Sequence, residues 1–68
     1  MPAAAIAFAA YPFEVQRGDF VHAEGAYRQV IDMRHAWPGS KSLIFRDNTV
    51  WLMSQQHVIY RPVLPDDQ

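Results

Sequence analysis

Histidine is the residue type in this chain best suited to metal binding or acid–base chemistry, and the chain contains His22, His35 and His57. No two of them are spaced as neighbours on one helix face or on one side of a strand, and no cysteine is present to complete a zinc site. Three separate elements would have to converge to hold a metal ion. We therefore expect no metal site and no cofactor, with the histidines at the surface or half-buried.

Nucleophilic catalysis has little support in the sequence. Ser40, Ser42 and Ser54 lie outside any nucleophile motif, no glycine-rich phosphate loop occurs, and the carboxylates are few and scattered. The chain is therefore expected to be a non-catalytic binding module of regulatory type, with no small-molecule substrate.

Basic residues are the next candidates, because their distribution is uneven. The formal net charge of −1 argues against a general polyanion binder, yet residues 26–61 carry a net charge of +3 between an acidic first part and an acidic end. Nucleic-acid binding would use Arg28, Arg34, Lys41 and Arg46, with Trp37 or Trp51 for base stacking. The competing interpretation is a set of scattered, solvated arginines, with both tryptophans in the core.

Residues 19–37 should position much of this chemistry. With Glu24-Gly25 as a two-residue turn, the expected pairs are Ala23 with Ala26, His22 with Tyr27, Val21 with Arg28 and Phe20 with Gln29. This strand interpretation predicts one core face and one charged face. The core face consists of Phe20, Tyr27, Ile31 and Met33, and the charged face of Arg28, Asp32 and Arg34.

Residues 26–37 also allow a helix, because Ala26, Val30, Met33 and Trp37 have helical spacing and Pro38-Gly39 would end a helix. An α+β fold therefore remains open as the alternative. The short turn before this segment and the hairpin after it favour the strand.

The second hairpin is expected over residues 42–46 and 49–53, around Asp47-Asn48. That turn would place Phe45 opposite Val50 and Leu43 opposite Leu52 on one side of the hairpin. The other side would hold Ile44, Trp51 and Met53. A small sheet buries one face, so this second side is either covered by the N-terminal segment or free as an interface. A last strand is expected over residues 57–61.

Residues 1–13 form an alanine-rich segment that we interpret as an N-terminal arm, ahead of a barrel domain at residues 14–63 and an acidic tail at residues 64–68. Its apolar side chains favour docking on the barrel or on a neighbouring molecule. A protein-interaction or self-assembling subunit is thus the alternative function. Its predicted interface residues are Ile6, Phe8, Ile44, Trp51 and Met53. Self-association would also add stability to a chain of 68 residues that has no disulfide.

No stretch of the sequence is long and apolar enough to span a bilayer, so no membrane partner is expected. The apolar run near the start is short and lacks a basic residue before it, which argues against a signal peptide. A cytoplasmic location is the resulting expectation.

The segment GDFVHAEGAYRQVIDMR resembles the opening hairpin of SH3-like small β-barrels, in which a Gly-Asp pair enters the first strand and a glycine turn leads to a long second strand. The resemblance covers about residues 17–63. It implies an all-β fold, a five-stranded antiparallel barrel, and binding of peptides, proteins or nucleic acid rather than catalysis. The alanine-rich arm departs from that pattern.

Overall fold

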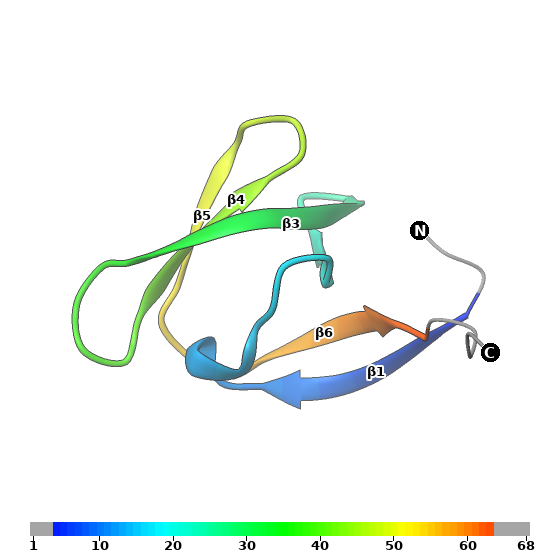
Figure 1. Cartoon of the computed structure of the whole chain (residues 1–68), viewed down its shortest axis with the longest axis horizontal. Coiled ribbons are helices and arrows are strands. Elements are labelled where there is room, and N and C mark those ends of the chain that lie inside the picture. The colour runs from blue at the N-terminus through cyan, green and yellow to red at the C-terminus, as the bar shows by residue number, and fades with distance from the viewer. Residues whose placement is uncertain (1–3, 64–68) are drawn as a thin grey trace, which may run out of the picture.

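One antiparallel sheet makes up the computed structural model, which describes residues 4–63. Its strands are β1 (Ala5–Ala10), β2 (Phe20–Ala23), β3 (Ala26–His35), β4 (Lys41–Phe45), β5 (Val50–Met53) and β6 (His57–Pro62), and a 3₁₀ turn, η1 (Pro12–Glu14), follows β1. The strand order is β1-β6-β2-β3-β4-β5, so the first and last strands lie side by side (Figure 1).

The expected all-β class is confirmed. The sheet has six strands rather than five, because residues 5–10 pair with β6 as a full strand instead of lying loosely on the domain. Over residues 4–63 the sheet is not closed into a barrel, since the edge strands β1 and β5 do not pair with each other. The predicted acidic tail and the first three residues of the arm lie outside the described residues.

The first hairpin has the predicted register, with His22 opposite Tyr27 and Phe20 opposite Gln29. Glu24 and Gly25 both have positive φ, at 54° and 82°. A two-residue turn of this kind matches the twist of the strands that it joins, and glycine adopts positive φ without steric cost. The helical alternative for residues 26–37 is wrong, because β3 runs unbroken through most of that segment and residues 4–63 contain no α-helix.

The predicted core face of this hairpin is wrong at three of its four positions. Val21 and Val30 are buried, whereas Tyr27 and Ile31 are exposed and Phe20 is half-buried on the other side of the sheet. We call the side that carries Val21, Val30 and Leu43 the inner face, and the opposite side the outer face. In the first hairpin, two valines rather than the aromatic residues therefore face the core.

A β-bulge explains why Met33 is nevertheless placed correctly. The pairing of β3 with β4 shifts between Val30 and Asp32, where an extra residue is inserted. Before the bulge the even-numbered residues point inward, and after it the odd-numbered ones do. Met33 consequently lies opposite Leu43 and packs against the core.

The second hairpin is shifted by one residue from its predicted register. Leu43 lies opposite Trp51 and Ile44 opposite Val50, and the turn is closed by a hydrogen bond of 2.9 Å from the Phe45 N–H to the Thr49 carbonyl. A one-residue shift moves every side chain of β5 to the other face. The predicted grouping of Leu43 and Phe45 with Val50 and Leu52 is therefore wrong: Val50 and Leu52 are exposed, and Met53 is buried.

The core lies on the inner face of the sheet, which curls so that the β1–β6 pair lies across from β3, β4 and β5 (Figure 1). Phe8, Ala23, Met33 and Trp51 pack around its margin. The fully enclosed apolar residues are Ala10, Val15, Val21, Val30, Leu43, Phe45, Met53 and Ile59.

A buried ion pair fixes the end of β6 to the segment before β2. The Arg61 guanidinium donates two hydrogen bonds of 2.9 Å to the carboxylate of Asp19, and the Gln16 N–H donates a third, of 2.8 Å, to the same carboxylate. Asp19 is buried, and Arg61 also donates to the Glu14 carbonyl at 3.0 Å. Two segments separated by most of the chain are thereby held together.

Candidate functional site

The predicted nucleic-acid-binding residues fall into two separate groups. Arg28 and Arg46 lie beside the tips of the two hairpins, whereas Arg34, Lys41 and Trp37 surround the opposite end, where β3 turns into β4. Arg34 lies six positions after Arg28, a distance of about 20 Å along β3. The sheet therefore does not bring the predicted set together as one basic face.

Acidic neighbours also neutralise part of this set. An Arg28 nitrogen lies 2.7 Å from an Asp47 oxygen, and its side chain reaches Glu24 at 3.5 Å. Arg34 lies 3.4 Å from Asp32. Lys41 and Arg46 form no ion pair with residues 4–63, and Arg46 instead donates to the Gln29 Oε1 at 2.8 and 3.1 Å. Trp37 is exposed in its loop.

Asp47 and Asp32 should make the free energy of unfolding weakly dependent on pH in the acid range. Hydrogen bonds from the Thr49 hydroxyl and N–H lower the pKa of Asp47, and the Met33 N–H, followed by Arg34 and Arg17, lowers the pKa of Asp32. The unfolded chain, with ordinary carboxyl pKa values near 3.8, binds protons first as the pH falls. Stability supplied by these groups is thus present above pH about 4 and is lost as the pH drops through the lowered pKa values.

Urea unfolding at a series of acidic pH values measures this effect. The free energy of unfolding of Asp47→Asn should fall less steeply below pH about 4 than that of the unchanged protein, because asparagine takes up no proton when the chain unfolds. An identical slope in both proteins would contradict the assignment.

An aromatic cluster occupies the outer face, where a one-layer sheet would ordinarily present polar side chains to water. Tyr27 contacts Tyr60 edge-on at a ring distance of 5.2 Å and His22 at 4.7 Å. Phe20 lies opposite both Gln29 and Tyr60 in the sheet. We call Phe20, Tyr27 and Tyr60 the aromatic platform; its members come from β2, β3 and β6.

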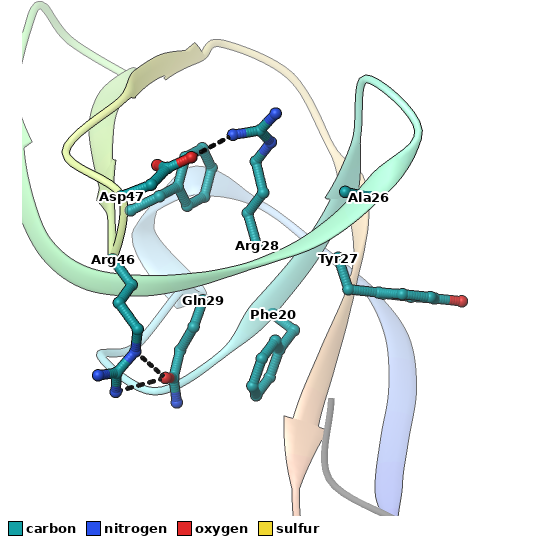
Figure 2. Close-up of a pocket in the computed structure, with 8 residues that line it drawn as sticks. Phe20, Ala26, Tyr27, Arg28, Gln29, Arg46 and Asp47 are labelled. Atoms are coloured by element: carbon teal, nitrogen blue, oxygen red, sulfur yellow. Dashed lines mark hydrogen bonds and ion pairs between the residues drawn. The ribbon is translucent and has the colours of Figure 1, made fainter.

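A groove of about 510 Å³ runs beside the platform at the hairpin tips. Figure 2 shows it on both sides of β3: Arg28 extends from one side to Asp47, while Gln29 on the other side lies near Phe20 and holds Arg46. Consecutive residues of a strand point to opposite faces, which accounts for this arrangement.

A second hollow of about 580 Å³ continues from the first and shares Phe20 and Gln29 with it. Arg17 and Arg61 lie along its wall, and Arg61 is held there by Asp19. The outer surface around the platform thus combines aromatic rings, an amide side chain and arginines. Such a surface can stack planar groups and accept negative charge.

Sequence reasoning missed the platform for an identifiable reason. The predicted hairpin register places Phe20 and Tyr27 on one face together with Ile31 and Met33, and that face is predicted to be the core. The sequence predicts Tyr60 only as part of a final strand. Of the predicted basic residues, Arg46 lies on this surface, and Arg28 reaches the groove from the inner side of β3.

The predicted interface residues are also divided by the register shift. Trp51 and Met53 face inward, with Met53 fully buried, so their expected common face with Ile44 does not exist. Ile44 instead lies on the outer face beside Val50. Phe8 packs against the core, and the Arg61 guanidinium carbon lies 4.9 Å from the centre of its ring. Of the five predicted interface residues, only Ile6 is largely exposed.

Metal chemistry gains no support from the described part of the chain. No group of three potential ligands is found in residues 4–63. His22 contacts Tyr27, and His57 contacts the Trp51 ring at 5.0 Å. Among the same residues, no helix is long and apolar enough to cross a membrane.

Comparison with known proteins leaves the chain without an assigned relative: no family model, no curated protein and no solved structure matches it.

Proposed function

We propose that the protein is a non-catalytic binding module that associates with single-stranded nucleic acid through the aromatic platform and the arginines beside it. The observation that carries this proposal is the grouping of Phe20, Tyr27 and Tyr60 on a solvent-facing side of the sheet. Nucleic-acid bases have planar π-faces, and stacking on an aromatic side chain contributes about 1–3 kcal/mol per base without demanding a particular sequence.

The charges beside the platform suit this ligand. Arg46 is held in place by a neutral side chain, so its charge is available to a phosphate group. Arg17 lines the neighbouring hollow with its side chain 72% exposed, and it also pairs with Asp32 at 3.3 Å. Because the chain's net charge is −1 and few cations are free, we expect modest affinity that declines with added salt.

Fluorescence anisotropy with a labelled single-stranded oligonucleotide tests the proposal. Tyr27→Ala should weaken binding roughly fivefold to a hundredfold, the equivalent of one stacked base. Tyr11→Ala is the matched control, because Tyr11 and Tyr27 have nearly equal exposure, 49% and 47%, and Tyr11 lies outside the platform.

Two charge variants extend the comparison. Arg46→Ala should weaken binding and reduce its salt dependence, whereas Arg34→Ala, at the far end of β3, should do neither. Absence of binding at low salt, or equal losses in Tyr27→Ala and Tyr11→Ala, would refute the proposal.

We also infer that β2 to β6 form an SH3-like unit to which β1 is an addition. This inference is supported by the order β6-β2-β3-β4-β5, a meander whose last strand returns to its first, and by the curl of the sheet. By analogy with SH3-like barrels, a unit of that kind would serve ligand binding rather than catalysis, in agreement with the proposed function.

Protein interaction or self-assembly is the second candidate function. It is favoured by the outer face of the second hairpin, where Val50 and Leu52 are exposed next to the half-buried Ile44. Substitution Val50→Lys would interrupt that strip with a charge. Its effect on the concentration dependence of the molecular mass tests this candidate.

A further inference from the structure

We infer that β1 is a dimerisation edge, and that its partner is β1 of a second copy of this chain, paired antiparallel about a two-fold axis. β1 is one of the two outermost strands of the sheet. Within residues 4–63 it is hydrogen-bonded on one side only, to β6, so its other side presents main-chain donors and acceptors that no described strand pairs with.

The register with β6 identifies which groups are free. The Val63 N–H donates to the Ala4 carbonyl at 3.2 Å, and hydrogen-bonded pairs alternate along an antiparallel ladder. Ile6, Phe8 and Ala10 therefore bond to β6. Ala5, Ala7 and Ala9 direct their N–H and C=O groups outward, consistent with Pro62, which has no N–H, lying opposite Ala5.

This free edge lacks the usual protection against pairing. Natural edge strands are commonly blocked by lysine, proline or a bulge. β1 reads AIAFAA, with no charge and no proline, and its register with β6 is regular throughout. An identical strand can approach it without placing like charges opposite each other, and the net charge of −1 makes repulsion between two copies weak.

Symmetry then selects one register. A two-fold axis perpendicular to the sheet places the central residue opposite its own copy. The hydrogen-bonded positions must be Ala5, Ala7 and Ala9, because their main-chain groups point outward. Centring on Ala7 uses all of them, because Ala5 then lies opposite Ala9 of the second copy. About six main-chain hydrogen bonds result.

The same register pairs the two large side chains of the strand. Ile6 of each copy falls opposite Phe8 of the other, at the closer, non-hydrogen-bonded positions. Ile6 is 58% exposed in the single chain, and this contact would cover it. One carbonyl needs a local change: the Gln56 side chain donates weakly to the Ala9 oxygen at 3.4 Å and would share it with the incoming N–H.

Molecular mass measured by sedimentation over a wide concentration range tests the inference. The unchanged chain should form a dimer and no larger species, because the pairing closes on itself. Ile6→Lys should weaken dimerisation roughly tenfold or more, by removing both Ile–Phe pairs and introducing two charges. Ile31→Lys is the matched control: Ile31 is 40% exposed on β3, which is not adjacent to β1 in the sheet, and this variant should have no influence on the mass.

Hydrogen exchange provides a second readout that does not depend on any substitution. In the dimer the amide of Ala7 should be protected at high concentration and should exchange freely on dilution, while the amides of Ile6 and Phe8 stay protected in both conditions. A monomer at every concentration, an open polymer, loss of association in Val50→Lys alone, or fast exchange of Ala7 within a dimer would each overturn the inference.

Discussion

Alanine at Met53 is expected to lower the free energy of unfolding by about 3 kcal/mol, whereas alanine at the preceding residue, Leu52, should lower it by less than about 1 kcal/mol. The two side chains have similar volumes and are adjacent on β5. Met53 is fully enclosed in the core, and Leu52 lies on the outer face. The difference arises because removal of a buried side chain leaves a cavity that the surroundings fill only partly.

This pair of variants is also a direct test of the register of the second hairpin. A two-residue turn at Asp47-Asn48 would reverse the outcome, since it would place Leu52 opposite Leu43. Urea unfolding of Met53→Ala and Leu52→Ala, analysed with a common slope, measures both values. A larger loss in Leu52→Ala would show that the predicted register was right and the observed one wrong.

The second large effect is expected from Arg61→Met, which should cost about 3 kcal/mol of stability. The methionine keeps the apolar part of the arginine side chain over Phe8 but leaves the buried carboxylate of Asp19 without its cation. Of the groups that now donate hydrogen bonds to this carboxylate, the Gln16 N–H would remain. An uncompensated buried charge is more costly than the absence of the whole pair.

A double-mutant cycle distinguishes this cause from a general loss of packing. Asp19→Asn combined with Arg61→Met should recover part of the loss, because the amide still accepts the Gln16 hydrogen bond and carries no charge. Arg34→Met is the control for an exposed ion pair and should change stability by less than about 0.5 kcal/mol. Equal losses in Arg61→Met and in the double variant would contradict the electrostatic explanation.

The contrast between the two hairpins shows what local sequence can and cannot determine. The Glu24-Gly25 turn has glycine at the second of its two positive-φ positions, and it sets the first register correctly. In the second hairpin, β5 has apolar residues on both faces, so no alternation distinguishes one register from the next. The outcome depends on the turn: Asp47 binds the Thr49 N–H and hydroxyl, Asn48 takes a φ of 70°, and Thr49 joins the turn.

The candidate site was predictable only in part, for a related reason. The β-bulge after Val30 reverses which residues of β3 face inward, and no residue in the sequence signals it. Uninterrupted alternation along β3 predicts Tyr27 and Phe20 on the same face as Met33, in the core, with the charged residues on the opposite face. Ion pairs such as Arg28–Asp47 join positions 19 residues apart, and their formation depends on how the two hairpin tips meet. The basic residues could be identified from the sequence, but their ion-pair partners could not be predicted from it.

The position of β6 between β1 and β2 has a consequence for synthesis of the chain. β1 is made first, but its only strand partner among residues 4–63 is the last strand to be made. Long-range pairings of this kind form late, because the loop between them must be closed first. AIAFAA should thus stay unpaired on the ribosome until residues 57–62 have emerged. An uncharged apolar segment that is unpaired is prone to aggregate with other nascent chains.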